Sequence, residues 1–118
     1  MDINKFKYCI NLSYSKDTCH KELQEFWDEE NKTLGHCALV ALKFYELFGG
    51  DIIKVDVENS LFGHYYNVVN NEIFDITKFQ FKNNEKFSNP RIKTYVSVLS
   101  DEEFKERYKL FRQKKQLN

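Results

Sequence analysis

The most constraining feature of the chain is an apolar segment near its middle that ends in two consecutive glycines. Residues 33–50 read TLGHCALVALKFYELFGG, and only Lys43 and Glu46 interrupt the apolar run that follows Cys37. A helix that is apolar nearly all round has to be buried, and Gly49 and Gly50 supply the left-handed backbone that ends a helix. The sequence therefore predicts a central buried helix against which the rest of the chain packs.

Three segments after this helix have the alternation of antiparallel strands. They read DIIKVDVE, FGHYYNVV and EIFDIT, and Asn70 and Asn71 between the last two suit a tight hairpin turn. A two-residue turn pairs Val69 with Glu72, and continuing the register pairs Val68 with Ile73, Tyr66 with Asp75 and His64 with Thr77. IKTYVSVL, residues 92–99, is predicted to be a further strand.

Helices are predicted on both sides of this central region. Residues 15–30 place Cys19, Leu23, Phe26 and Trp27 on one face after a polar start, as in an amphipathic helix. Ser100 and Glu103 have the spacing of a capping box, which opens a last helix with Phe104, Tyr108 and Phe111 facing inward. The order of these elements predicts an α+β fold, with a buried cysteine-bearing helix on an antiparallel sheet of three to four strands.

Length and charge limit the number of domains and the kinds of partner. We expect 118 residues to form a single domain, with 1–14 an N-terminal segment, 15–111 the core and 112–118 a frayed tail. Lys plus Arg equals Asp plus Glu at 18 each, so neither nucleic acid nor an anionic membrane is expected as a partner. The oligomeric state is left open.

The cysteine count and the N-terminal residues indicate a compartment. Three cysteines form an odd set with no paired spacing, which fits a reducing environment. Charged residues interrupt the N-terminal stretch, unlike a secretory signal peptide, and no run reaches transmembrane length. A cytoplasmic protein is therefore expected.

Cys37 is the candidate nucleophile. With Thr33 as the predicted N-cap, its thiol lies in the first turn of the buried helix, where the helix dipole and unpaired N–H groups favour a thiolate. The competing interpretation is a small core residue, because buried cysteines are common.

His64 and Asp75 supply the context that favours chemistry. In the predicted hairpin they are diagonal neighbours on one face, roughly 7 to 8 Å apart between backbones. His64 would take the thiol proton, Asp75 would fix the imidazole tautomer, and the thiolate would attack a carbonyl. Asn67 falls on the opposite face and is expected to be structural.

An oxyanion formed in this reaction needs hydrogen-bond donors. The backbone N–H of Cys37 is one, and Asn31, His36 and Tyr66 are the side-chain candidates for contacting the oxyanion or the substrate. The residues leave open amide or peptide hydrolysis, transfer of an acyl group to an amine, and isopeptide cleavage, since all share the first step.

Several short motifs together resemble the small bacterial YunG-like family. They are Trp27, TLGHCA at 33–38, FGGDI at 48–52, HYYN at 64–67, DIT at 75–77, Gln80 with Phe81, and in the last helix Arg107, Tyr108 and Leu110, spanning roughly residues 20–111. The resemblance implies a minimal papain-like or transglutaminase-like core with Cys, His and Asp in its site. This chain departs from the family in having His36 where Gln usually precedes the cysteine, which removes an amide donor or replaces it with an imidazole.

Two other functions compete with thiol chemistry. A catalytically silent binding module would use the Phe-rich loop 78–92 as a contact surface, although Phe79 and Phe81 are expected to be core anchors. A zinc site could draw on the set Cys19, His20, His36, Cys37 and His64, but no CxxC or HxxxH clamp is present. Cys9 has only a packing role, and neither a metal nor a cofactor is expected.

Overall fold

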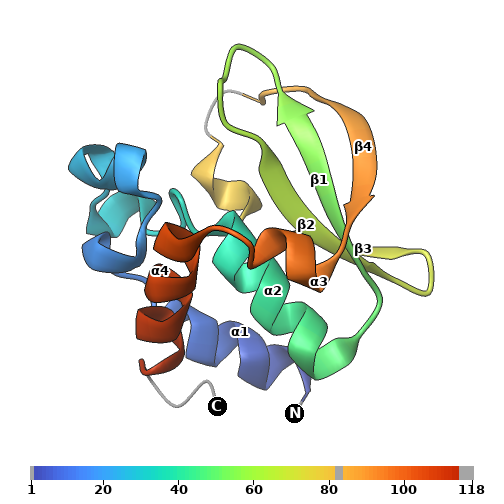
Figure 1. The fold of residues 1–118 in the computed structure, drawn as a ribbon, viewed down its shortest axis with the longest axis horizontal. Helices are drawn as coiled ribbons and strands as arrows, with labels where there is room; N and C mark the ends of the chain where they lie inside the picture. The colour runs from blue at the N-terminus through green and yellow to red at the C-terminus, as the bar shows by residue number, and fades with distance from the viewer. Residues whose placement is uncertain (1, 82–83, 115–118) are drawn as a thin grey trace.

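The computed structural model describes residues 2–81 and 84–114, which form an α+β fold (Figure 1). Its four-stranded sheet has the order β3-β2-β1-β4, and every neighbouring pair is antiparallel. The strands are β1 (Asp51–Val57), β2 (His64–Val69), β3 (Glu72–Phe74) and β4 (Phe87–Lys93). The predicted fold class and the antiparallel sheet are confirmed.

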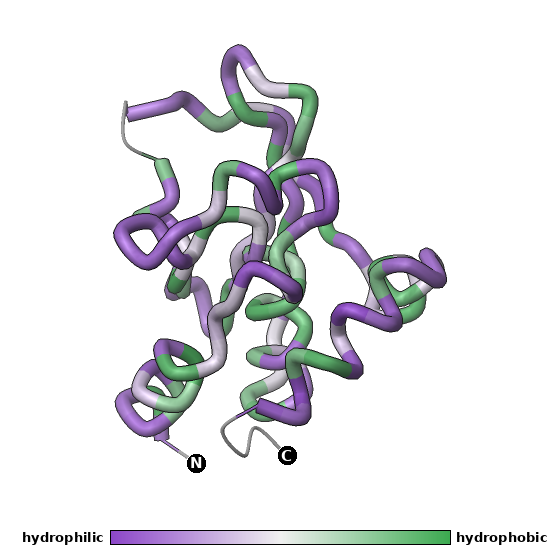
Figure 2. The backbone as a smooth tube through the Cα atoms, turned by 90° about the vertical axis from the view of Figure 1, so that its left-hand side faces the viewer, coloured by the Kyte–Doolittle hydropathy of each residue, from purple (hydrophilic) through white to green (hydrophobic). Residues whose placement is uncertain are grey.

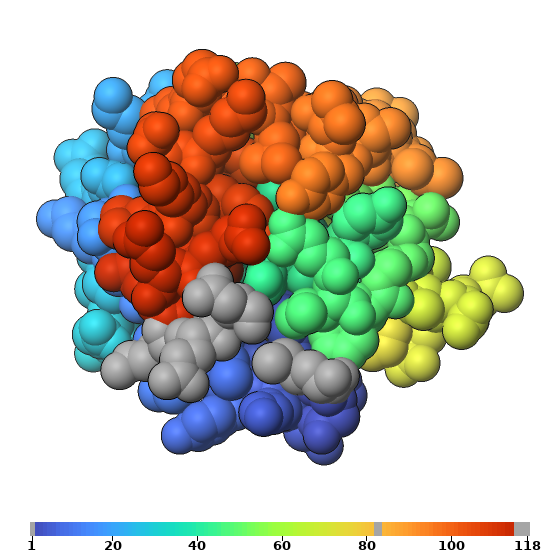
Figure 3. Space-filling view, turned by 60° about the horizontal axis from the view of Figure 1, so that its bottom comes forward, coloured from blue at the N-terminus to red at the C-terminus, as the bar shows by residue number. Residues whose placement is uncertain are grey.

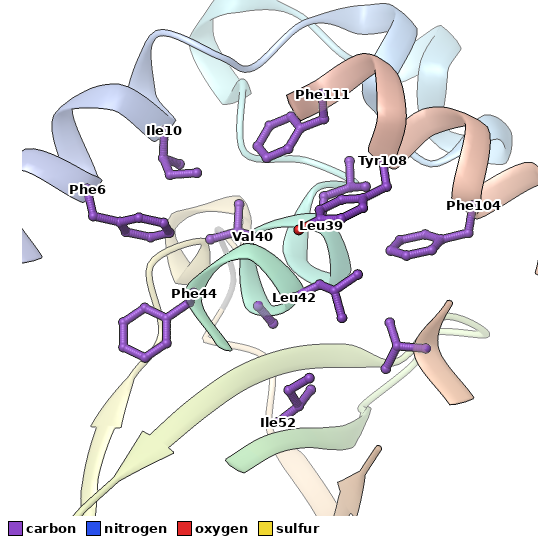
Figure 4. Packing of buried hydrophobic residues seen from close by; sticks show 12 residues of the cluster. Phe6, Ile10, Leu39, Val40, Leu42, Phe44, Ile52, Phe104, Tyr108 and Phe111 are labelled. Atoms are coloured by element: carbon purple, nitrogen blue, oxygen red, sulfur yellow. The ribbon is translucent and has the colours of Figure 1, made fainter. Parts of the chain in front are cut away.

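The predicted buried helix is α2 (Cys37–Phe48), which packs on β1 and β2. Figure 4 shows its side chains between the sheet on one side and α1 (Ile3–Asn11) and α4 (Glu102–Arg112) on the other. Hydrophobic residues gather on the central helix coils, whereas hydrophilic residues dominate the outer turns (Figure 2). Gly49, with φ 73°, ends α2 as predicted.

The start of α2 differs from the prediction. The helix begins at Cys37 with His36 as its N-cap, so Thr33 is not the cap. Gly35 has φ 73°, a left-handed conformation that prevents a helix from running through this position. Cys37 is therefore the first helical residue.

The first helix of the chain is α1, within the segment that was expected to lie outside the core. Phe6 and Ile10 of α1 are fully buried in the main hydrophobic cluster. Asp2 caps the helix by accepting a hydrogen bond from the Lys5 backbone N–H at 2.8 Å. The core therefore extends beyond residues 15–111.

The predicted amphipathic helix over 15–30 is wrong. The segment forms three short 3-10 helices, η1 (Lys16–Thr18), η2 (Lys21–Phe26) and η3 (Glu29–Asn31). His20 accepts from the Glu22 N–H at 3.2 Å and Asp28 accepts from the Glu30 N–H at 2.9 Å, so side chains interrupt the helical ladder locally. Cys19 is buried as expected, but Phe26 is 64% exposed.

The predicted strand over 92–99 divides into two elements. β4 ends at Lys93, and α3 (Tyr95–Val98) begins with Thr94 as N-cap, whose hydroxyl accepts from the Ser97 N–H at 3.1 Å. The predicted capping box at Ser100 is also wrong, because Asp101 is the N-cap of α4 and the Ser100 hydroxyl donates to the Ser97 carbonyl.

The inward face of the last helix is as predicted. Phe104, Tyr108 and Phe111 are buried, and α4 lies against the segment that carries η1 (Figure 3). α4 ends at Arg112, and residues 115–118 of the predicted tail lie outside the described residues.

The hairpin register is confirmed only near the turn. Val69 pairs with Glu72 and Val68 with Ile73, but the ladder ends where Asn67 pairs with Phe74. The predicted pairings of Tyr66 with Asp75 and of His64 with Thr77 do not form, because the chain leaves the sheet and enters η4 (Lys78–Gln80). Across residues 2–81 and 84–114, no helix has the length and apolar character needed to span a membrane.

Candidate active site

Cys37 lies at the start of α2, half-buried, on the wall of a cavity of about 810 Å³. The cavity lies between the η2 segment, the β1–β2 loop and the corner between α3 and α4. His36 makes no side-chain capping hydrogen bond to the first turn of α2. The helix dipole and the first-turn N–H groups therefore favour negative charge beside the cavity.

His64 begins β2 and lies behind this wall, fully buried. Its Nε2–H donates to Asp75 Oδ1 at 2.8 Å, the contact that the sequence predicted. Asp75 reaches His64 from the end of the hairpin rather than from a paired strand position. Asp75 thus fixes the orientation of the imidazole and leaves its Nδ1 to face other partners.

The pKa of His64 depends on both Asp75 and Cys37. Burial lowers the pKa of His64 most strongly, but hydrogen bonds to Asp75 and Cys37, with the negative charges of both, raise it overall to about 9. The imidazolium form of His64 is therefore favoured at neutral pH, and this form can donate hydrogen bonds from both ring nitrogens.

Gln80 is a site residue to which sequence reasoning assigned no role. Its Nε2 donates to the Thr77 carbonyl at 3.2 Å, and its Oε1 accepts from the Gly35 N–H at 3.4 Å. The same Nε2 also contacts the Thr77 hydroxyl at 3.3 Å and His64 Nδ1 at 3.5 Å. Gln80 therefore joins the turn after Asp75 to the loop before Cys37, and only its place in the family motif could have indicated it.

Aromatic rings enclose the imidazole. The Phe81 ring meets His64 edge-on at 4.8 Å between centroids, and the Phe87 ring lies tilted at 5.1 Å. Phe81 also lines the cavity, whereas Phe79 is exposed and is not the core anchor that was expected. This apolar enclosure strengthens the electrostatic interactions of His64 with its partners.

The Asp75 side chain also faces a groove, in addition to its contact with His64. Its side chain is 13% exposed and lines a separate groove of about 630 Å³ that includes Tyr8 of α1 and Ile73 of β3. Cys37 is not among the residues that line this groove. The cysteine and the carboxylate therefore open onto different cavities, with His64 between them.

The three side-chain candidates for oxyanion or substrate contact lie elsewhere. Asn31 donates to the Gln80 carbonyl at 3.5 Å and links η3 to η4, and Tyr66 has its ring centroid 6.3 Å from that of His64. Neither Asn31 nor Tyr66 nor His36 lines the cavity beside Cys37. Asn67 is buried and donates to the Ala41 carbonyl at 3.0 Å, a contact that suits the expected structural role.

His36 is a buried core histidine. Its Nδ1–H donates to the Leu34 carbonyl at 2.9 Å, and its Nε2 accepts from the Thr18 hydroxyl at 2.7 Å, which together define the neutral tautomer. Tyr14 packs edge-on against the ring. Burial is the largest influence and lowers the pKa of His36 to about 4.

The candidate zinc ligands are not gathered in one place. Within the described ranges 2–81 and 84–114, no three His, Cys, Asp or Glu side chains come together as a group that could hold a metal ion. His20 caps η2 and packs against Phe62, while His36 bonds Thr18 and Leu34.

The fold and the site together define an α+β protein in which a buried histidine lies between a carboxylate that it contacts and a cysteine on the wall of a cavity. The chain belongs to the YunG family, since the family described as "YunG protein" matches residues 2–117. It is 36% identical over 76 residues to the "Uncharacterized protein YunG" of Bacillus subtilis (strain 168). The alignment covers 64% of this chain and 60% of that relative, less than two thirds of the relative's length. No solved structure matches the chain significantly.

Proposed function

We propose that the chain is a thiol-dependent acyl-transfer enzyme with a papain-like or transglutaminase-like core. The observation that supports this most is the position of His64, whose Nε2 is hydrogen-bonded to Asp75 at 2.8 Å and whose pKa is raised by its interactions with Asp75 and Cys37. Cys37 itself lines the large cavity at the start of α2. A nucleophile, a base and an orienting carboxylate in this order are the components of an activated cysteine.

The reaction would begin with attack of the Cys37 thiolate on an amide carbonyl carbon. A carbon–sulfur bond forms while the carbonyl electron pair moves to oxygen, and the Cys37 backbone N–H is placed to stabilise that oxyanion. His64 then gives its Nδ1 proton to the leaving amine as the carbon–nitrogen bond breaks, which leaves a thioester. His64 next takes a proton from water or an acceptor amine, which attacks the thioester and frees Cys37.

The first test is the labelling rate of Cys37 by iodoacetamide, with Cys9 and Cys19 as internal references in the same chain. Mass spectrometry locates the label. We expect Cys37 to react at least about tenfold faster than Cys9 at pH 7, since a thiolate is the reactive form. His64→Ala should remove this advantage, and Cys37→Ala should fold normally but lose the reaction.

Two results would contradict the proposal. Slow labelling of Cys37 that does not change in His64→Ala indicates a core cysteine in a binding module. One bound zinc per chain that is lost on mutating Cys37 or His64 indicates a metal site.

A further inference from the structure

The cavity beside Cys37 has both apolar and polar residues on its wall. The larger apolar side chains come from η2, the loop before α2, the β1–β2 loop, the turn after η4, α3 and α4; they include Leu23, Leu34, Phe62, Phe81, Val98 and Phe104. A concave surface of this kind binds apolar groups, and its polar groups then fix the orientation of the ligand.

Lys54 is the cation on this wall that lies nearest to the ring beside Cys37. Its Nζ stands 5.4 Å from the centroid of the Tyr65 ring, and both residues line the cavity. Burial raises the pKa of Tyr65 most, and the charge of Cys37 raises it further, so the cysteine is also a neighbour of that ring. Lys54 and Cys37 therefore flank the same aromatic side chain.

The other charges on the wall differ from Lys54 in their setting. Arg107 is held by Glu103 at 2.6 Å and donates to the Thr18 carbonyl at 3.1 Å. Of the acidic residues on the wall, Glu58 and Asp101 are exposed and Glu85 is half-buried. Lys54 is half-buried, and among the described residues no carboxylate lies within ion-pair distance of its Nζ. A half-buried ammonium beside a ring retains charge that an anionic group of a ligand can pair with.

We propose that the substrate is an amide that carries a carboxylate close to the scissile carbonyl and an apolar side chain next to it. Lys54 would bind the carboxylate, the apolar wall would hold the side chain, and the carbonyl carbon would lie at the Cys37 sulfur. A short peptide attacked near its C-terminus has this chemistry. This inference rests on the proposed function, because it assumes that Cys37 is the nucleophile.

A pair of matched alkylating probes tests the inference. N-chloroacetyl-leucine has a free carboxylate, and N-chloroacetyl-leucinamide replaces it with a neutral amide of nearly the same size. In both, the Cys37 thiolate forms a carbon–sulfur bond to the chloromethyl carbon, and chloride leaves with the electron pair. The measured quantity is the ratio of the two rates at Cys37, determined by mass spectrometry.

We expect the acid to react about threefold to tenfold faster than the amide at Cys37, the size of a partly screened ion pair. Lys54→Met keeps the length of the side chain and removes its charge, so the ratio should fall to that of Cys9. Lys93→Met, which changes net charge equally on β4 away from the cavity, should keep the wild-type ratio. Circular dichroism and urea unfolding establish that each variant is folded.

The outcomes separate this inference from the proposed function. Fast Cys37 labelling by both probes, with an acid-to-amide ratio that does not change in Lys54→Met, overturns the carboxylate site and leaves the nucleophile intact. An acid-to-amide ratio that falls equally in Lys54→Met and Lys93→Met also overturns the carboxylate site, because the change then follows the net charge of the protein and not the position of Lys54. Slow labelling by both probes and by iodoacetamide overturns both proposals.

Discussion

The charge of a single buried imidazole is set by its neighbours. His64 is fully buried, yet its interactions with Asp75 and Cys37 outweigh desolvation and raise its pKa to about 9. Neutral pH is below this value, so the imidazole is protonated. Both of its ring nitrogens are then hydrogen-bond donors.

Replacing Asp75 by Asn should lower the pKa of His64. The amide oxygen can still accept from Nε2–H, but the negative charge that favours imidazolium is lost. Imidazole NMR signals of His64 should then titrate at lower pH, by about one unit or more. Asp56→Asn removes a carboxylate that pairs with Arg91 on the sheet and should leave the His64 titration unchanged. An unchanged titration in Asp75→Asn would mean that the contact carries no charge interaction.

The contact between His64 and Asp75 could be predicted from the hairpin turn, although the strand register behind that prediction ends at Asn67 and Phe74. The placement of Gln80 could not, since it depends on the η4 turn that follows the strand. His36 and Cys37 are adjacent in sequence but face different surroundings, one in the core and one on the cavity wall. Adjacent residues at a helix start diverge in direction, and sequence spacing alone does not say which of them faces a cavity.

At the scale of elements, the loop that delivers Cys37 depends on close packing at Gly35. A Cβ atom on Gly35 would lie 2.5 Å from the Cys19 sulfur and 2.8 Å from the His20 backbone nitrogen. No side chain fits here unless the η1–η2 connection moves, so the 3-10 segment and the start of α2 are fixed against each other.

Gly35→Ala should therefore destabilise the fold and disturb the start of α2, with Gly49→Ala as the comparison. Both glycines have φ 73°, so both substitutions strain the backbone, but a Cβ on Gly49 meets nothing within 4 Å. The clash at Gly35 should add about 1 to 3 kcal/mol to the loss, measured by urea unfolding. Gly35→Ala should also slow alkylation of Cys37, whereas Gly49→Ala should not. Cys37 alkylation that is unchanged in Gly35→Ala would show that the contact with Cys19 relaxes freely.

The elements that could be predicted are those whose hydrophobic or turn pattern is stronger than any competing side-chain cap. The apolar run of α2 and the Asn-Asn turn are strong signals, and both elements form as expected. The β-branched residues of 92–99 favour a strand by propensity, but Thr94 caps a helix at the end of β4. In the 15–30 segment, the caps formed by His20 and Asp28 interrupt a helical pattern that the apolar positions alone support.

At the scale of the whole molecule, two buried histidines with opposite shifts set the pH range of stability. His36 has its folded pKa lowered to about 4, so it contributes stability above its unfolded value near 6.5 and loses it as pH falls toward 4. His64 has its folded pKa raised to about 9, so its contribution is complete below 6.5 and is lost as pH rises through 9.

The free energy of unfolding should therefore be largest near pH 6.5 and fall on both sides, by up to about 3 kcal/mol for each histidine. Urea unfolding at pH 4.5, 6.5 and 8.5 measures the loss of stability on the acid and alkaline sides. His36→Gln should reduce the loss between pH 6.5 and 4.5, and His64→Gln should reduce the loss between pH 6.5 and 8.5, whatever each does to stability at pH 6.5. A wild-type profile that is flat between pH 4.5 and 8.5 would contradict both shifts.

The position of Asp75 between His64 and the second groove gives the two ends of this contact separate access to solvent. The carboxylate touches the groove near α1, whereas Cys37 lines the larger cavity, and neither residue lines the other's opening. A reagent for the cysteine and a reagent for the carboxylate would therefore enter the protein by different openings. The two ends of the contact through His64 can thus be probed independently of each other.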